Sequence, residues 1–300
     1  MQDDELWDVD RVEHSAEMAA RVRQAAAWAT DADGVSPLNE QAHRILEGRL
    51  PGEHWVGIEG DELIGYAQLD PDTASVQLFV APGHRHQGVG RMLAEEINAE
   101  NPDLSWWSFG TLPAAQKLAN CLGLSPQREL LKMALDPSRT PLPPAGPAPE
   151  GIVVESFTPD AIDELVSVNA RAFAHHPEQG AMSRADVEEK MTAPWFDPEG
   201  LLIAVDESDT MLGFHWTKIT EEHRSGSGRQ RVGEVYVIGV LPEAAGRGLG
   251  RHLLEAGLSH LADQDVDRVE LFVEGDAERV VRMYRRAGFE VVLRDTLWGA

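Results

Sequence analysis

Apolar positions follow helical spacing in one clear segment and strand-like patterns in several others. Residues 249–261 carry leucines on one side only, which is typical of an amphipathic helix. Before this helix, the runs 199–206, 211–219 and 233–240 are rich in branched and aromatic residues and predict three strands. The stripe of the helix consists of Leu249, Leu253, Leu254, Leu258 and Leu261.

Two further elements follow the helix. Residues 266–274 predict a strand, and residues 276–288 predict a short helix with Asp276 as its N-cap and Gly288 as its end. Strands that alternate with helices in this way predict a mixed α/β domain.

The same pattern occurs twice in the chain. Residues 76–97, VQLFVAPGHRHQGVGRMLAEEI, align with residues 236–257, YVIGVLPEAAGRGLGRHLLEAG, at a constant offset of 160. Upstream, residues 61–69 parallel 209–217 at an offset of 148. We assign the difference of 12 residues to an extra loop at 221–231.

The alignment continues downstream, where residues 119–130 parallel 284–295 at an offset of 165. Each copy is predicted to run helix, helix, three strands, a glycine-rich turn, helix, strand, helix and strand. The chain is therefore expected to be a tandem duplication of one α/β domain.

A proline-rich segment separates the two copies. Five prolines fall within ten residues of DPSRTPLPPAGPAPEG, residues 136–151, and they favour an extended spacer over a helix or a central strand. We expect a first domain at 1–136, a linker at 137–150 and a second domain at 151–300.

The charge balance limits the partners. The chain has 51 Asp and Glu against 26 Lys and Arg, a formal net charge of −25. Such a surface argues against nucleic acid or an anionic membrane as partner. We expect small-molecule substrates and a monomeric chain.

The number of cysteines and the N-terminal sequence indicate which redox chemistry and which cellular location to expect. The single Cys121 excludes an intramolecular disulfide and a cysteine-rich metal site, and its apolar helical surroundings predict that it is buried. No metal is expected. The acidic N-terminus has no apolar signal-like run, and no segment approaches membrane-spanning length, so the expected location is the cytoplasm.

The turn at 243–255, EAAGRGLGRHLLE, is the first candidate binding element. Gly246, Gly248 and Gly250 remove side chains just before a helix, so backbone N–H groups of its first turn can face an anion. Arg247 and Arg251 flank the turn. The spacing fits neither a P-loop nor a Rossmann turn, and an ordinary tight strand–helix connection remains the alternative.

The wider order of motifs resembles the GCN5-related N-acetyltransferase (GNAT) family. In that family a Q/R-x-x-G-x-G/A turn holds the pyrophosphate of acetyl-CoA through backbone amides. The resemblance implies two tandem GNAT acyl-CoA N-acyltransferase domains, each a mixed, mostly antiparallel sheet flanked by helices. The turn of the first copy fits the motif fully with Arg85, His86, Gln87, Gly88, Val89 and Gly90, followed by Arg91.

The second turn departs from the motif at one position. It reads Ala245, Gly246, Arg247, Gly248, Leu249, Gly250 and Arg251, so the leading Gln or Arg is absent. The resemblance assigns the preceding strand residues to the cofactor as well. In the two copies these are Leu78, Phe79 and Val80, and Ile238, Gly239 and Val240.

Longer strings are similar to the mycothiol synthase family of actinobacteria. They are DGVSPLNEQ (33–41), FAHHPEQG (173–180), WFDPEGL (195–201), GFHWTK (213–218) and GEVYVIGV (233–240). That family moves acetyl from acetyl-CoA to the cysteinyl amine of a cysteinyl-glucosaminyl-inositol. The resemblance implies the same reaction here, by direct transfer in a ternary complex.

Two residues are candidates for proton transfer. The resemblance makes Glu234 the general base and Tyr284 the donor to the departing sulfur. Read alone, they are a strand-end carboxylate and a core tyrosine. At the repeat offsets they correspond to Ala74 and Ala119, so the chemistry is predicted to belong to the second copy.

The same family suggests where the substrates bind. The amides at 238–240 would polarise the acetyl carbonyl, with Gly239 marking a bulge. Two positions depart from the family. Phe272 stands where the family has a substrate-contacting Tyr, and Ala277 stands where it has a CoA-contacting Asn. The resemblance also implies that Arg282 contacts the cofactor. The substrate positions are Glu40, Glu178, Lys218, Glu234 and Phe272.

Two rival functions remain at this point. One is a tandem acetyltransferase for another small polar amine, such as an aminoglycoside, which would share the repeat and the glycine turns. An acyl-CoA-binding sensor without catalysis would need only the glycine turns.

Overall fold

The computed structural model describes residues 7–175, 177–224 and 228–300, apart from the side chains of residues 177, 178 and 222–224. The chain divides into two compact units. The first contains Met1–Leu131, Glu274–Asp276 and Leu293–Ala300, and the second contains Lys132–Val273 and Ala277–Val292. The domain bounds expected from the sequence stay a prediction. Residues 141–149, which hold the five prolines, form neither helix nor strand.

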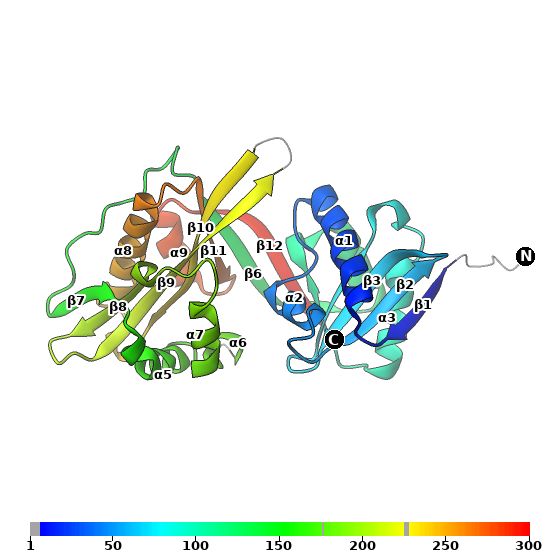
Figure 1. The fold of residues 1–300 in the computed structure, drawn as a ribbon, viewed down its shortest axis with the longest axis horizontal. Coiled ribbons are helices and arrows are strands. Elements are labelled where there is room, and N and C mark those ends of the chain that lie inside the picture. Colours follow the sequence, from blue (N-terminus) through cyan, green and yellow to red (C-terminus); the bar gives the residue numbers. More distant parts are fainter. Residues whose placement is uncertain (1–6, 176, 225–227) are drawn as a thin grey trace, which may run out of the picture. The chain divides into compact units, whose positions relative to one another are not determined.

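The first unit is a mixed sheet flanked by helices (Figure 1). Its sheet order is β1-β2-β3-β4-β5-β12, in which only the β4–β5 pair is parallel. The helices are α1 (Ala16–Asp33), α2 (Glu40–Leu46), α3 (Val89–Glu100) and α4 (Pro113–Cys121). The strands are β1 (Asp8–Val12), β2 (Glu53–Glu59), β3 (Glu62–Asp70), β4 (Ser75–Val80), β5 (Ser105–Ser108), the start of β6 (Ser125–Leu135) and the end of β12 (Glu290–Gly299).

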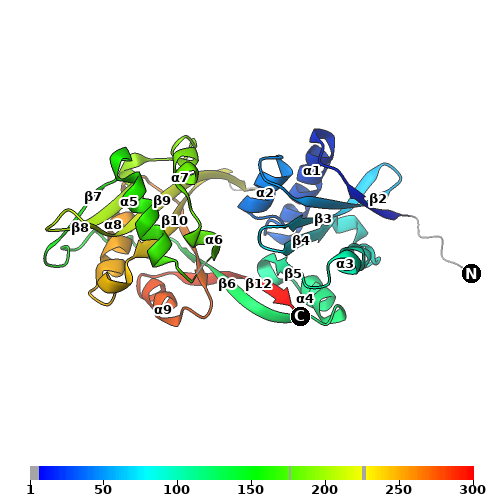
Figure 2. The ribbon, with the colours of Figure 1, turned by 90° about the horizontal axis from the view of Figure 1, so that it is seen from below.

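The second unit repeats this plan (Figure 2). Its sheet order is β6-β11-β10-β9-β8-β7, with β10 and β11 parallel. The strands are β7 (Ile152–Ser156), β8 (Leu201–Asp206), β9 (Met211–Arg224), β10 (Gly228–Val240) and β11 (Arg268–Glu274). The helices are α5 (Ile162–Ala172), α6 (Pro177–Gly180), α7 (Arg184–Met191), α8 (Leu249–Asp263) and α9 (Glu278–Arg286). The mostly antiparallel sheet flanked by helices is therefore confirmed for both units.

Each unit begins with a strand that the sequence pattern did not predict. β1 and β7 have five residues each and are largely exposed, so they lack the alternation of apolar and polar residues that predicts a strand. The second unit also has three helices before β8, where two were expected.

Backbone hydrogen bonds confirm the repeat. Ala81 N donates to Ile64 O at 2.8 Å, and Leu241 N donates to Leu212 O at 2.9 Å, which are the same bond at offsets of 160 and 148. At the end of the last helix, Leu124 N to Ala119 O (2.9 Å) corresponds to Phe289 N to Tyr284 O (3.1 Å), at an offset of 165. The alignment that pairs Tyr284 with Ala119 is therefore structural as well as sequential.

The extra residues of the second copy lengthen a hairpin. We expected a loop at 221–231, but β9 continues to Arg224 and β10 begins at Gly228, so most of the insertion is paired strand. Residues 225–227 lie outside the described residues. The sequence SGSG suggested a loop because its small polar residues mark a turn, yet the residues beside it pair.

Three local predictions can be compared with the structure. The N-cap of α9 is Ala277 and not Asp276, although Gly288 ends the helix as expected, with φ of 99°. Cys121, predicted to be buried, is exposed at the end of α4, because the side of this helix that is buried is the one that carries Ala119. The helix expected at 249–261 is confirmed as α8.

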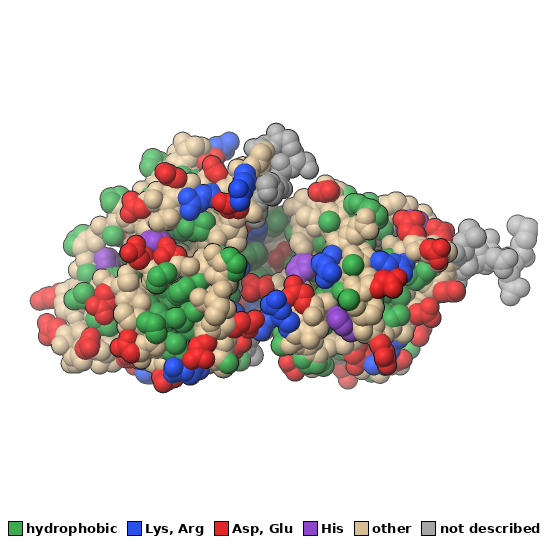
Figure 3. All heavy atoms as spheres, in the orientation of Figure 1, with side chains coloured by type: hydrophobic (Ala, Val, Ile, Leu, Met, Phe, Trp, Pro, Cys, Tyr) green, Lys and Arg blue, Asp and Glu red, His purple; other side chains and the backbone are tan. Residues whose placement is uncertain are grey.

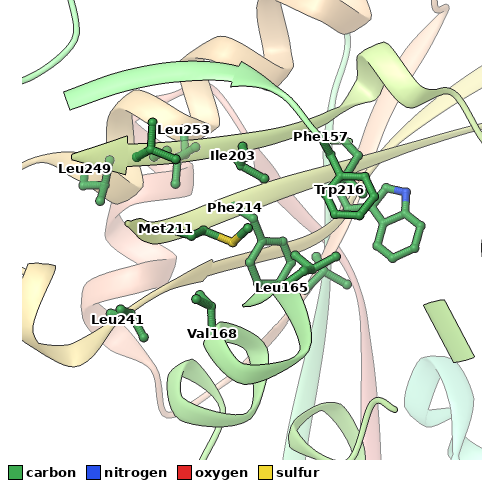
Figure 4. Close-up of a cluster of buried hydrophobic side chains, with 14 of the residues drawn as sticks. Phe157, Leu165, Val168, Ile203, Met211, Phe214, Trp216, Leu241, Leu249 and Leu253 are labelled. Atoms are coloured by element: carbon green, nitrogen blue, oxygen red, sulfur yellow. The ribbon is translucent and has the colours of Figure 1, made fainter. Parts of the chain in front are cut away.

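The sheet of the second unit buries an apolar core against α5. Leu165 and Val168 of α5 point toward Phe214 of β9 (Figure 4), and all three are almost fully buried. Trp216, two residues along the same strand, belongs to the same cluster and is inaccessible to solvent. This packing fixes the face of β9 and β10 that lies under the α5–α7 segment.

Acidic side chains are spread over the visible surface and do not gather in one patch (Figure 3). This distribution agrees with a solvating role for the net charge of −25. Among the helices of the described residues, none has the length and apolar content needed to cross a membrane.

The last strand of the chain, β12, completes the sheet of the first unit. A substitution of Trp298 on this strand tests how much that packing contributes to stability. The Trp298 side chain is 7% exposed, and its Nε1 donates to Ser108 Oγ on β5 at 2.8 Å. Trp298→Ala should lower the free energy of unfolding by about 3–5 kcal/mol, because a large buried ring is lost. The control Trp28→Ala removes a ring that is 48% exposed and should change it by less than about 1 kcal/mol. Urea unfolding followed by circular dichroism measures both, and equal midpoints would contradict the assignment.

His215 gives the fold a pH dependence. It is fully buried on β9 with its Nδ1 2.7 Å from Leu253 O, and burial lowers its pKa to about 4. The unfolded chain therefore takes up a proton near pH 6.5 that the folded chain accepts only near pH 4. Stability should fall by about 3 kcal/mol as pH drops through this window.

Urea unfolding at pH 7, 6 and 5 measures this loss. His215→Gln should reduce the dependence without abolishing it, because burial also lowers the pKa of His54 to about 4, while replacement of the exposed His175 by Gln should leave it unchanged. A slope in His215→Gln as steep as in the wild type would show that other groups cause it.

Candidate active site

The glycine turn of the second unit has the geometry of an anion site. Gly248 caps α8 with φ of 87°, Gly246 has φ of 82°, and both are in the left-handed region that glycine adopts freely. The first helical bond is donated by His252 N to Gly248 O at 3.0 Å, so the amides before it have no partner inside the helix. Open space surrounds the point where a Cβ on Gly248 would stand.

The turn of the first unit has a similar backbone conformation, but a different side chain lies beside it. Gly88 caps α3 with φ of 101°, and His86 adopts φ of 62° where the second unit has Gly246. The indole of Trp7 lies 3.7 Å from the point where a Cβ on Gly88 would stand. The indole therefore stands beside this turn, whereas the corresponding point of the second turn is open.

The leading arginine of the motif stabilises the turn from within. Arg85 donates to both carboxylate oxygens of Asp33, at the end of α1, at 2.7 and 2.8 Å, and to Val80 O at 3.1 Å. Its second-copy equivalent, Ala245, lacks this contact. There Arg171 near the end of α5 pairs with Glu243, two residues before Ala245. In the first unit the turn supplies the arginine and the helix the carboxylate, and in the second unit the reverse holds. In both, an ion pair joins the end of a helix to the turn.

The arginines near the second turn differ in how they are placed to contact an anion. Arg251 is paired with Glu255 at 2.7 Å, and Arg91 is paired with Glu95 in the same way at 2.6 Å. Arg279, which sequence reasoning missed, has its Nη2 3.8 Å from the point where a Cβ on Gly246 would stand. Its position in the repeat is taken by Ala114 in the first unit.

The strand that leads into the turn separates from its parallel neighbour. β10 pairs with β11 over Val232–Val235 and with β9 over almost its whole length. Beyond Val235 the β11 side of the strand carries no registered pairs in the described residues, which leaves backbone groups of the 238–240 segment available to a ligand. The first unit separates in the same way, since β4 pairs with β5 over Ser75–Gln77.

The bulge lies elsewhere than predicted. The register between β9 and β10 shifts between Val235 and Val237, so Tyr236 is the extra residue and Gly239 is not. Gly239 pairs regularly with Phe214, and a Cβ there would lie 2.9 Å from that ring and 3.1 Å from Phe173. Glycine is present because the two rings pack against its Cα.

Glu234 occupies the face of β10 turned toward α5–α7. It is half-buried, and its register partners are Lys218 on β9 and Glu270 on β11. Gly233, its neighbour, faces Leu261 of α8, so Glu234 faces away from that helix. The structure therefore brings together two of the predicted residues, Glu234 and Lys218.

Aromatic side chains line the same face, and sequence reasoning did not select them. The Lys218 ammonium lies 4.9 Å from the ring centre of Tyr236 and 5.2 Å from that of Trp195. Trp195 also contacts Tyr236 and Trp216, with ring centres 5.3 and 6.0 Å apart. The bulge at Tyr236 turns this ring toward the others, a consequence that residue spacing alone does not reveal.

Tyr284 lies on α9 in a buried position. It is 3% exposed, its ring meets Phe289 edge to face at 5.8 Å, and burial raises the pKa of its phenol. A phenol with a raised pKa keeps its proton at neutral pH and can act as a donor. Its first-copy equivalent, Ala119, is buried too but carries no polar group.

The remaining predicted residues are more scattered. Phe272 is 45% exposed on β11, with Lys132 Nζ 5.7 Å from its ring centre. Arg282 pairs with Glu278 at 2.9 Å. Glu40 begins α2 in the first unit. The side chain of Glu178, on α6, lies outside the described residues.

Two family models match the chain. The acetyltransferase (GNAT) family model matches residues 164–289, and an acetyltransferase (GNAT) domain model matches residues 51–120. A tandem GNAT protein from the clavulanic acid biosynthesis pathway has a similar structure, with a TM-score of 0.73, 19% identity, and coverage of 98% of each chain. A GCN5-related N-acetyltransferase from Sphaerobacter thermophilus has a TM-score of 0.72 and 24% identity, over 98% of this chain and 95% of that one.

Sequence relatives are more specific. The mycothiol acetyltransferase of Propionibacterium freudenreichii subsp. shermanii is 48% identical over 89% of this chain and 83% of its own length. That of Paenarthrobacter aurescens is 38% identical over 94% of this chain and 92% of its own.

The paired glycine turns, the separated strands and these matches define an N-acetyltransferase built from two GNAT domains, a class of enzyme that uses acetyl-CoA. More narrowly, the chain belongs to the mycothiol acetyltransferase family. Among the described residues, no group of three His, Cys, Asp or Glu side chains is arranged to hold a metal ion.

Arg279 provides a test of the second turn. Arg279→Ala should raise the KM for acetyl-CoA about 5- to 20-fold, since a charge-assisted contact to phosphate contributes about 1–2 kcal/mol. Arg286→Ala, two helical turns further along α9, is the matched control and should leave KM within about twofold. Steady-state kinetics with acetyl-CoA varied measures both, and an unchanged KM in Arg279→Ala would remove this residue from the cofactor site.

Proposed function

We propose that this chain transfers the acetyl group of acetyl-CoA to the cysteinyl amine of a cysteinyl-glucosaminyl-inositol, the last step of mycothiol biosynthesis. The relatives named mycothiol acetyltransferase support this acceptor. The observation that carries the proposal is the distribution of side chains over the repeat. Both units have the glycine turn, whereas the candidate proton-transfer residues Glu234 and Tyr284 occur in the second unit only. Strand register places Ser75 of the first unit at the position of Glu234, where the sequence offset predicted Ala74, and Ala119 takes the place of Tyr284.

Glu234 acts as the general base in this proposal. The amine of a cysteinyl amide is in large part an ammonium near neutral pH, and attack on a thioester requires the neutral form. The carboxylate accepts that proton, directly or through one water. Its half-buried position on the rigid strand β10 keeps the carboxylate at a defined place beside the substrate face.

Tyr284 acts as the general acid. When bound, acetyl-CoA supplies the thioester, and its sulfur departs as a thiolate that needs a proton. Burial keeps the proton on Tyr284 Oη until it is required, which suits a donor rather than a base. The amides of residues 238–240, on the separated part of β10, are placed to polarise the acetyl carbonyl.

The turn residues hold the cofactor by the same reasoning. In the second unit these are Ala245 to Arg251, joined by Arg279, with the strand residues Ile238 to Val240. Ala277, the N-cap of α9, and Arg282 in the middle of that helix are further proposed cofactor positions. In the first unit the corresponding segments are 78–80 and 85–91. We assign the first unit a binding or structural role because it lacks both proton-transfer groups.

The substrate face uses the residues around Lys218. Its ammonium, held over two aromatic rings, can donate to hydroxyl and ring oxygens of a sugar. Glu40, Glu178 and Phe272 remain proposed substrate contacts. The chemistry is direct transfer in a ternary complex, so much of the rate arises from holding amine and thioester in attack geometry. The cytoplasmic location stays a prediction.

Two conservative substitutions test the assignment. Glu234→Gln and Tyr284→Phe should each lower kcat by about 10²–10⁴-fold, since each removes one proton-transfer group, while the Kd for acetyl-CoA changes by less than about threefold. Release of free CoA thiol from acetyl-CoA and cysteinyl-glucosaminyl-inositol measures turnover, and titration calorimetry measures binding.

The outcomes separate the possible functions. Full turnover in both variants would refute the catalytic assignment. Faster turnover of an aminoglycoside than of cysteinyl-glucosaminyl-inositol would replace the acceptor. Tight acetyl-CoA binding without thiol release on any amine would indicate a sensor.

A further inference from the structure

A carboxylate that the proposed mechanism does not use lies beside the general base. Glu270 on β11 is the register partner of Glu234 on β10, and the two strands are parallel. Paired residues of neighbouring strands lie about 4.8 Å apart and point to the same face. Glu270 is 6% exposed, while its neighbours Val269 and Leu271 face the opposite side and are fully buried apolar residues.

Two cations hold this buried carboxylate. Lys132 Nζ on β6 lies 2.5 Å from Glu270 Oε2, and an Arg268 nitrogen lies 2.5 Å from Oε1. Arg268 and Glu270 are two residues apart on β11, so they share a face. We call Lys132, Glu270 and Arg268 the β11 charge triad. A buried carboxylate paired in this way is weak evidence of added stability over apolar residues.

Charges on several elements face Glu234. The negative charge of Glu270 opposes ionisation of Glu234, whereas nearby cations favour it. At separations near 5 Å in a partly buried site, each such interaction is large enough to move a titration by about one pH unit. The groups facing Glu234 are Lys218 on β9, the triad on β6 and β11, Tyr236 on β10 and, over the ring of Tyr236, Lys190 on α7. The side chain of Glu178, on α6, lies outside the described residues.

We propose that Glu270 is a positioning residue that sets the proton affinity of Glu234 through the β11 charge triad. Its negative charge keeps Glu234 basic enough to accept a proton from an ammonium, and Lys132 and Arg268 limit the effect so that Glu234 stays ionised at neutral pH. The inference rests on the proposed function, because it takes Glu234 as the base.

Opposite charge changes within the triad should move the acidic limb of the kcat profile in opposite directions. Glu270→Gln leaves two cations near Glu234 and should shift the limb to lower pH by about 0.5–1 unit. Lys132→Met leaves Glu270 less compensated and should shift it to higher pH by a similar amount. Glu270→Asp keeps the charge and should restore the wild-type limb to within about 0.2 unit.

The experiment measures kcat from pH 5 to 9 at saturating acetyl-CoA and cysteinyl-glucosaminyl-inositol. A second readout needs no turnover: the ¹³Cδ shift of Glu234, assigned by its loss in Glu234→Gln, is titrated by NMR in the full chain. Both readouts should shift with the same sign in each variant. If the Glu270→Gln protein does not fold, Lys132→Met still tests the inference, because it changes the charge of the triad in the opposite direction.

Two results would overturn the inference in distinguishable ways. If Glu234→Gln abolishes turnover but neither triad variant moves the limb, or both move it in one direction, Glu270 does not act through Glu234. A rise in the KM for the amine with an unmoved limb would likewise make Glu270 a substrate contact. If Glu234→Gln retains full turnover, the base assignment fails, and the inference fails with it.

Discussion

The site of the second unit depends on where one strand pairing ends. β10 keeps its antiparallel bonds to β9 almost throughout, but its parallel register with β11 stops at Val235. The strand is therefore rigid on one side while the backbone near residues 238–240 is available on the other. Because only the turn at 241–248 separates Val240 from the start of α8 at Leu249, the N-terminal amides of this helix lie beyond the strand end. A thioester carbonyl and a pyrophosphate have donors along one continuous stretch of main chain.

The first unit has the same separated strand followed by a glycine turn and a helix. This backbone arrangement therefore does not explain why the chemistry is assigned to the second unit. The differences are in side chains around a shared frame. Trp7 stands beside Gly88 where the space at Gly248 is open, and Ala114 takes the place of Arg279. The buried Ala119 takes the place of Tyr284. The repeat thus acts as an internal comparison in which the fold is constant and the chemistry varies.

Much of this could be predicted from the sequence because the strongest signals were periodic or repeated. The leucine stripe of α8 predicted a helix, and a constant offset was enough to align the two turns. Side-chain partners were harder to predict. Arg85 matched a phosphate-binding motif, yet its guanidinium is bound to Asp33, which is 52 residues earlier. Only the fold brings these two residues together.

Local backbone irregularities were also beyond a sequence pattern. A bulge depends on the register between two strands, so glycine at 239 was an understandable but wrong signal, and the extra residue is Tyr236. The aromatic group around Lys218 follows from that bulge and was missed for the same reason. Glu270 was not selected from the sequence, because its burial and its two cations depend on β6 and β11 together.

The bulge at Tyr236 changes which residues of the two copies correspond. Before the bulge, β10 pairs Glu234 with Lys218 and Glu270, and β4 pairs Ser75 with Asp70 and Ser105, so the strand register aligns Glu234 with Ser75 and not with Ala74. Both positions lie in a strand that is paired on both sides, so the backbone of either unit could hold a carboxylate there. The two units differ at this point in their side chains, because Glu234, Lys218 and Glu270 of the second unit stand where the first has Ser75, Asp70 and Ser105. The difference that assigns the chemistry to the second unit is therefore one of residue type and not of strand length.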